Sequence, residues 1–150
     1  MDIGSLFDSA LLDRHYSPRI FAYYFKHWNG YDMAFHRHDS TEIMYVIHGS
    51  CAVEWQEERK AAASARLGKG EFILLDAGVP HRLVVEGSCR MLNVEFGFAP
   101  HKGELPSVKT FAEEDVSLRE LLAVRRASMT LQDPDEVYHA LKSLVLELDY

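Results

Sequence analysis

The sequence predicts a mainly β protein with helices at its carboxyl end. Between residues 21 and 98, short runs of β-branched and aromatic residues alternate with glycine-containing turns every ~8 to 12 residues, which is typical of an antiparallel sandwich or barrel. After Ala99 a polar linker leads into apolar residues at helical spacing. We therefore expect a β barrel followed by a pair of α-helices.

The β elements follow from the turns between them. The aromatic run 21–28 predicts a strand, Asn29-Gly30 predicts a tight turn, and a second strand then carries two histidines as far as residue 47. Turns at 48–50, 68–70, 76–80 and 86–88 separate strands at 52–55, 71–75, 82–85 and 90–98. The charged and alanine-rich stretch 56–65 predicts a long exposed hairpin loop. Ahead of these strands, residues 1–20 form a short helical face or an arm lying on the barrel.

Two helix starts are visible in the carboxyl-terminal part. Ser117 and Glu120 form a capping box. Asp133 and Pro134 mark a second start, and the helix that follows carries one apolar stripe, which consists of Val137, Leu141, Leu144, Val145 and Leu148. This stripe either packs onto the barrel or forms a homodimer with its twin across a two-fold axis.

The domain organisation follows from these elements. We expect residues 1–100 to form a barrel with an amino-terminal arm and residues 101–150 to form a helical dimerisation and linker segment. The chain ends at Tyr150 while the pattern is still helical and without a glycine cap, so we expect a truncated piece of a longer protein.

Composition excludes several classes of function. A chain of 150 residues with a net charge of −7 repels phosphate backbones, so we expect no direct binding of nucleic acid by this segment. Its two cysteines, Cys51 and Cys89, are too few for a disulfide framework and predict a cytoplasmic protein with buried, inert thiols. The sequence shows no signal peptide, and no apolar run approaches the ~20 residues that cross a membrane.

The candidate site lies in residues 30–49, GYDMAFHRHDSTEIMYVIHG. His36, His38 and Glu42 occupy even-numbered positions, which project to one face of an extended strand. Two imidazoles and a carboxylate are ligands of first-row transition metals, although the same side chains could line a pocket for a polar small molecule. His81 follows the turn 76–80 and adds a fourth candidate ligand.

The spacing of these residues resembles that of the cupin superfamily, whose members are double-stranded β-helices, or jelly-roll barrels. The first cupin motif is matched at every fixed position, by Gly30, His36, His38, Glu42 and Gly49. The second motif is matched in part, by Gly70, Gly78 and His81, whereas Asp76 replaces its proline and Val85 its asparagine. The resemblance implies that a divalent transition metal, Zn, Ni, Fe or Mn, is held by His36, His38, Glu42 and His81. The alternative is a hydrogen-bonded polar cluster that lines an effector pocket.

A narrower resemblance, along nearly the whole chain, is to the amino-terminal domain of AraC-type transcriptional regulators. It is carried by HRHDSTEIMYVIHG, then LGKGEFILLDAGVPH, then a strand and two amphipathic helices. It implies a barrel that binds a small effector, often a sugar, a helical pair that makes a homodimer, and contact with DNA through a helix-turn-helix domain that is absent from this chain.

Two further residues belong to the expected ligand site. Asn93 and Glu95 share strand parity with Met91 in the run RMLNVEFGF. Glu95 either faces the pocket and accepts hydrogen bonds from ligand hydroxyls, or points to solvent from an edge strand. Trp28 and Trp55 are expected to pack in the core or at its rim, although either could stack on a sugar ring.

The alternative function is a metal-dependent cupin enzyme, either a dioxygenase or a sugar isomerase. Such an enzyme needs acid, base or substrate-orienting groups beside its metal. Glu95 is the one strong candidate for such a group in the sequence, so we expect a regulator and not an enzyme.

Overall fold

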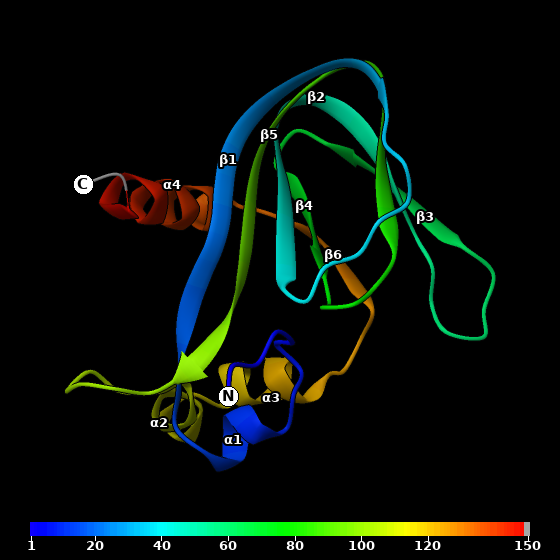
Figure 1. Ribbon diagram of the computed structural model, residues 1–150. Coiled ribbons are helices and arrows are strands. Elements are labelled where there is room, and N and C mark those ends of the chain that lie inside the picture. Colours follow the sequence, from blue (N-terminus) through cyan, green and yellow to red (C-terminus); the bar gives the residue numbers. More distant parts are fainter. Residues whose placement is uncertain (149–150) are drawn as a thin grey trace.

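The computed structural model describes residues 1–148, and its strands form one curled antiparallel sheet (Figure 1). The strand order is β1-β5-β2-β4-β6, and β3 pairs with β2. The strands are β1 (Tyr16–Asp32), β2 (Thr41–Trp55), β3 (Ala63–Gly68), β4 (Glu71–Leu75), β5 (His81–Pro100) and β6 (Ser128–Gln132). The helices are α1 (Ala10–Asp13), α2 (Val108–Glu114), α3 (Val116–Ala123) and α4 (Glu136–Leu148). The expected mainly β jelly-roll barrel with helices after it is confirmed.

The three long strands β1, β2 and β5 arch over the top of the molecule in Figure 1, and they run through positions where the sequence predicts turns. At Asn29-Gly30 the register of β1 against β5 shifts, and at 46–52 the register of β2 against β5 shifts twice. The predicted turns at 29–30, 48–50 and 86–88 are therefore wrong. A glycine with a positive φ can occupy a β-bulge as well as a hairpin turn. Bulges allow a long strand to bend around a barrel without ending.

Gly49 shows why a bulge in β2 needs glycine. Its φ is +85°, and a Cβ at this position would lie 2.1 Å from the backbone oxygen of Ser88 and 3.1 Å from Cα of Cys89. Any larger residue would push β2 away from β5 at this point.

The carboxyl-terminal part differs from the predicted pair of helices. Helices α2 and α3 follow the barrel, capped by the side chains of Ser107 and Asp115 and not by Ser117. Strand β6, which is not predicted, then pairs antiparallel with β4 before α4 begins. An exposed strand edge favours such pairing, so the open edge of β4 decides the structure of residues 128–132. The predicted start of α4 is confirmed, since Asp133 accepts hydrogen bonds from the backbone N–H groups of Val137 and Tyr138.

Residues 56–62 leave the barrel between β2 and β3, so the expected exposed loop is shorter than predicted, because residues 63–65 already pair with β2. None of the helices among residues 1–148 has the length and apolar character needed to span a membrane.

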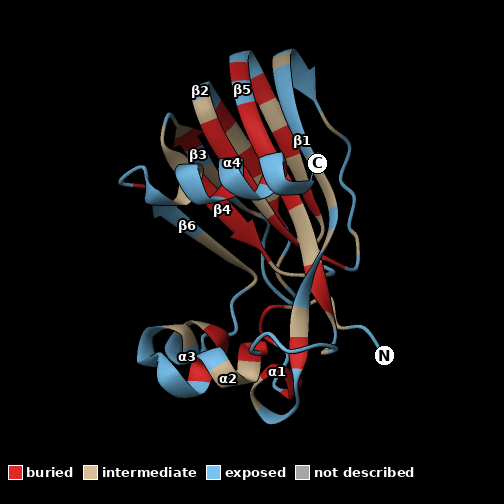
Figure 2. Cartoon of the chain, turned by 90° about the vertical axis from the view of Figure 1, so that its left-hand side faces the viewer, coloured by how far each residue is buried: buried red, intermediate tan, exposed pale blue. Residues whose placement is uncertain are grey.

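Three apolar clusters hold the fold together (Figure 2). The first fills the inside of the barrel and includes Met44, Val53 and Met91. The second joins the amino-terminal arm and α1, through Phe7 and Leu11, to α2, α3 and the end of the barrel. The third lies between α4 and the outer face of the sheet. Because side chains alternate along a strand, one face of β2 and β5 contributes side chains to the barrel interior, and the other face packs against α4.

Candidate functional site

The predicted site residues come from three separate segments of the barrel. His81 is the first residue of β5, and its backbone exchanges two hydrogen bonds with His36, of 2.9 and 3.0 Å. His36 and His38 lie in the segment 33–40, which joins β1 to β2 and contains no regular strand, contrary to the prediction. This segment is nevertheless extended beside β5, so His36 and His38 still project towards Glu42 on β2.

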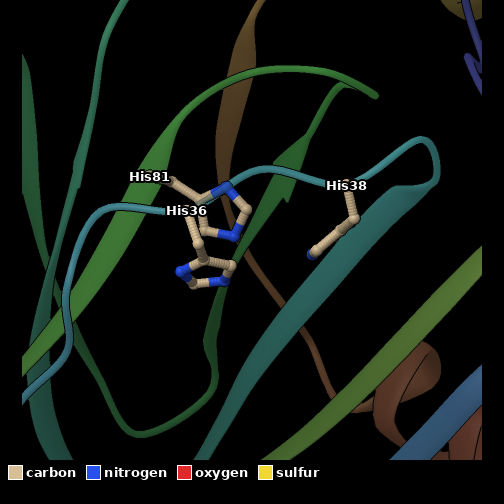
Figure 3. Close-up of side chains that lie close together, drawn as sticks. All are labelled: His36, His38 and His81. Atoms are coloured by element: carbon tan, nitrogen blue, oxygen red, sulfur yellow. The ribbon is translucent and has the colours of Figure 1, made fainter.

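The side chains converge on a small volume. The ligand nitrogens of His36, His38 and His81 all lie within 4.8 Å of one another, and Figure 3 shows the rings of His36 and His38 on one segment and that of His81 on β5. The Nε2 atom of His38 lies 3.4 Å from a carboxylate oxygen of Glu42 and 3.4 Å from one of Glu95. The Nε2 atom of His81 lies 3.6 Å from Glu42. His38 therefore joins two groups of candidate ligands, one with His36 and His81 and one with Glu42 and Glu95.

The cluster has a buried inner part, which we call its floor, and an accessible outer part, which we call its mouth. Glu42 and His81 are 3% and 2% exposed, whereas His38 and Glu95 are partly accessible and His36 is exposed. In and beside this cluster, three buried atoms have no hydrogen-bond partner among the described residues, and these are Oε2 of Glu42, Nε2 of His81 and Oδ1 of Asn93. Burying an unpaired polar atom is costly, so these atoms fit a site whose partner is a bound ion or ligand.

The histidines present their Nε2 atoms to this point because their Nδ1 atoms are engaged elsewhere. Nδ1 of His81 lies 2.8 Å from the carbonyl oxygen of Val79, and Nδ1 of His36 lies 3.1 Å from that of Ala34. A carbonyl oxygen can only accept, so each Nδ1 carries the proton and each Nε2 keeps a free lone pair. Ring orientation by a second hydrogen bond is usual for histidines that bind metals.

The orientation of His38 is set through a hydroxyl group. Its Nδ1 atom lies 3.1 Å from Oγ of Ser40, and that hydroxyl donates to Glu95 at 3.4 Å. Since the hydroxyl proton is used on Glu95, the Ser40 oxygen accepts the Nδ1 proton of His38. Ser40 is buried and is not among the predicted site residues.

The electrostatics keep the cluster in a form suited to a cation. Burial opposes ionisation of Glu42, but its contacts with the imidazoles of His38 and His81 outweigh burial and lower the pKa of Glu42 to about 2. Contact with the Glu42 carboxylate raises the pKa of His38, against the effect of its partial burial. Glu42 is therefore ionised at neutral pH, and in the absence of a metal a proton on His38 balances part of its charge.

Tyr24 is a site residue that sequence reasoning missed. It lies on β1 opposite Asn93 on β5. Burial raises the pKa of the Tyr24 hydroxyl to about 12, the charges of Glu42 and Glu95 add to this effect, and Asn93 opposes it. The hydroxyl is thus a protonated hydrogen-bond donor at the mouth of the cluster. Only the register of β1 against β5 reveals this position, and the sequence does not show that register.

Comparison with known proteins gives one family match, which covers the barrel and α4. The family described as AraC-like ligand binding domain matches residues 20–148. No curated protein sequence matches the chain significantly.

Several solved structures are similar to the chain. The protein NMB1881 from Neisseria meningitidis is 23% identical, with a TM-score of 0.42, over 53% of this chain and 81% of that one. A cupin-2 domain containing protein from Shewanella frigidimarina is 24% identical, with a TM-score of 0.41, over 61% of this chain and 87% of that one. A mutant of the oxalate decarboxylase OxdC from Bacillus subtilis is 16% identical, with a TM-score of 0.47, over 81% of this chain and 39% of that one.

Proposed function

Because the chain belongs to the family of AraC-like ligand binding domains, we propose that it is the effector-sensing part of an AraC-type transcriptional regulator. A small molecule binds inside the barrel and changes how a helix-turn-helix domain, outside this chain, engages DNA. The observation that carries the proposal is the set of buried polar atoms without partners inside the barrel. A ligand that prefers one arrangement of the barrel over another shifts the population of the whole regulator.

The unpaired atoms favour a hydroxylated effector, such as a sugar. Oε2 of Glu42 and Oδ1 of Asn93 are buried acceptors, and the indole N–H groups of Trp28 and Trp55 are buried donors, all without partners among the described residues. The two tryptophans pack with the apolar cluster that fills the inside of the barrel. A hydroxyl group both donates and accepts, so a molecule with several hydroxyls can satisfy both kinds of atom.

We further propose that His36, His38, Glu42 and His81 hold a divalent transition metal ion, which is Zn, Ni, Fe or Mn. Two observations support this proposal: the ligand atoms of His36, His38 and His81 lie within 4.8 Å of one another, and Oε2 of Glu42 and Nε2 of His81 are buried without a partner among the described residues. When bound, the ion supplies a Lewis acid for an oxygen atom of the effector. Glu95 contacts His38 and Ser40, which helps to hold the His38 ring in place.

Elemental analysis tests the metal proposal. The wild-type protein is equilibrated with each of the four ions, dialysed and analysed, beside His38→Ala and a control variant, His48→Ala, which changes an exposed histidine on β2. We expect one equivalent of metal in the wild type and in the control, and loss of that metal in His38→Ala. Equal metal content in His38→Ala and the wild type would refute the metal site, and the effector pocket would then consist of side chains alone.

We also propose that the chain forms a homodimer through α4. Leu141 and Val145 of this helix are buried against the sheet, whereas Leu144, Leu146 and Leu148 are 36%, 56% and 43% exposed. The apolar surface of α4 is therefore wider than the part that packs against the barrel. A second copy of the same helix would remove the remaining leucines from water.

The alternative function is a metal-dependent enzyme, a dioxygenase or a sugar isomerase, and one observation favours it. Tyr24 pairs with Asn93 across the sheet, and the charges of Glu42 and Glu95 act on its hydroxyl, so the cluster has a proton donor in addition to its candidate metal ligands. Its raised pKa makes Tyr24 a poor base at neutral pH, which suits ligand binding better than proton abstraction. Release of a chemically altered product from metal-loaded protein and a sugar would favour the enzyme, and return of the unchanged sugar favours the sensor.

A further inference from the structure

The two cysteines of the chain lie side by side inside the barrel, away from the proposed metal ligands. Cys51 on β2 is 3% exposed and Cys89 on β5 is 0% exposed, and both belong to the apolar cluster that fills the barrel. Cys89 pairs across the sheet with Gly49, the bulge residue two positions before Cys51. The close approach of β2 and β5 at Gly49 thus brings two thiols from distant parts of the sequence together.

The two thiols lie within hydrogen-bond reach of each other. The side-chain hydrogen bond with Cys89, together with burial, raises the pKa of Cys51, and the same hydrogen bond lowers the pKa of Cys89 in spite of burial. Cys51 is therefore the donor and the Cys89 sulfur is the acceptor. A sulfur that accepts such a bond is the better nucleophile of the two.

Small molecules can reach Cys51 from solvent. Cys51 lines a surface cavity of about 250 Å³, together with Arg66 on β3 and Gly87 on β5. The positive charge of Arg66 acts on Cys51 and favours its ionised form. A water molecule occupies roughly 30 Å³ of liquid, so the cavity admits a molecule little larger than water, such as hydrogen peroxide.

We propose that Cys51 and Cys89 are an oxidation site at which hydrogen peroxide produces a reversible disulfide within the chain. The Cys51 sulfur attacks one peroxide oxygen, the O–O bond breaks, and the departing hydroxide takes up the Cys51 thiol proton to leave as water, which gives a sulfenic acid on Cys51. The Cys89 sulfur then attacks the Cys51 sulfur, the S–S bond forms and the S–O bond breaks, and the departing hydroxide takes up the Cys89 proton and leaves as a second water. In total, two thiols lose two hydrogens, and one peroxide is reduced to two waters.

The disulfide would tie β2 to β5, the strands that also carry Glu42, Asn93 and Glu95. Oxidation therefore changes the freedom of the strands that form the pocket without touching a pocket residue. The site is independent of the identity of the effector and of the presence of a metal.

The test is peptide mapping of the folded chain after treatment with hydrogen peroxide in a metal-free buffer. We expect the mass of the intact chain to fall by two hydrogens, a cross-linked peptide pair that contains residues 51 and 89, and return of both thiols after a dithiol reductant. Cys51→Ser and Cys89→Ser each remove the cross-link, and the remaining cysteine then gains oxygen or stays reduced.

Several results would overturn the proposal. These are two free thiols in oxidised wild type, oxygen added to either cysteine with no cross-linked pair, or a disulfide between chains. Where a serine variant does not fold, the peptide map of the wild type alone decides. A second wild-type sample, oxidised in denaturant, serves as control: cross-linking as fast as in the folded chain would show that the fold does not assemble the pair.

Discussion

Nε2 of His81 and Oε2 of Glu42 lie 3.6 Å apart at the floor of the barrel, and neither atom has a hydrogen-bond partner among the described residues. His81 is the first residue of β5 and Glu42 the second residue of β2, so two different strands aim buried polar atoms at the same point. A lone pair and a carboxylate oxygen repel one another unless a proton or a metal ion lies between them. This pair is therefore the most sensitive part of the candidate site.

Replacing Glu42 by Gln should weaken metal binding by at least about 10-fold, because the amide keeps the shape of the side chain but removes the charge that attracts the ion. Calorimetric titration with Zn²⁺ and Ni²⁺ measures the effect. Glu104→Gln, in the exposed linker after β5, is the matched control and should bind like the wild type. Unchanged affinity in Glu42→Gln would remove Glu42 from the ligand set.

The start of α4 gives a prediction for pH dependence. Burial of Asp133 raises its pKa. The Tyr45 hydroxyl, which donates to Asp133 at 2.6 Å, and backbone N–H groups outweigh this effect, so the pKa of Asp133 is lowered overall. A carboxylate with a lowered pKa stabilises the fold above its unfolded pKa, near ~3.9, and loses that contribution as the pH falls through the folded value. Asp133→Asn should therefore lower the free energy of unfolding by about 1–2 kcal/mol at pH 7, and by progressively less as the pH falls from ~3.9 towards the folded pKa of Asp133.

Urea unfolding at several pH values measures this difference. Asp135→Asn is the control, because Asp135 is exposed at the same helix start and its side chain makes no hydrogen bond within residues 1–148. A pH-independent loss in Asp133→Asn would show that the Asp133 carboxylate acts through packing and not through its charge.

The bulge in β2 predicts that Gly49→Ala is strongly destabilising. The new Cβ would meet the Ser88 backbone oxygen at 2.1 Å while the backbone holds a φ of +85°, so the strand must shift. The left-handed conformation alone costs about 1–3 kcal/mol. In Gly87→Ala the added Cβ meets nothing within 4 Å, so this variant should unfold like the wild type. Equal stability of both variants in thermal unfolding would contradict the tight approach of β2 and β5.

The proposed dimer is tested by placing charges on the exposed side of α4. Leu144→Glu combined with Leu148→Glu leaves the buried Leu141 and Val145 unchanged, so the barrel should stay folded while the dimer dissociates to monomers. Sedimentation velocity reports the mass, with Leu105→Glu, a change at an 80% exposed linker residue, as control. A wild-type chain that is monomeric at all concentrations would refute the dimer.

The sequence was informative where the signal is local. His36, His38 and Glu42 lie within seven residues, so their common direction follows from spacing alone, even though the first two lie outside any regular strand. His81 could be placed only through its resemblance to a known motif. The structure brings Asn93 and Glu95 to the same side of β5 as the cluster. The sequence left open whether Glu95 faces the pocket or solvent, and its contacts with His38 and Ser40 show that it faces the pocket.

Other features depend on pairings that no local pattern contains. Gly30 and Gly49 have the positive φ that turns and bulges share, so the sequence could not decide between them. Strand β6 exists because β4 offers it an edge, and Tyr24 joins the site because β1 pairs with β5 in one register. Such long-range pairing is decided by the folded chain as a whole.

The outer face of the barrel gives α4 an unusual position relative to the pocket. Glu42 and Asn93 face inward, while their neighbours Ile43 and Val94 face outward and pack in the cluster that contains Leu141 and Val145 of α4. The proposed ligand pocket and α4 thus lie on opposite faces of the same two strands. If the pocket binds an effector, a conformational change in β2 or β5 would therefore move residues that contact α4 directly.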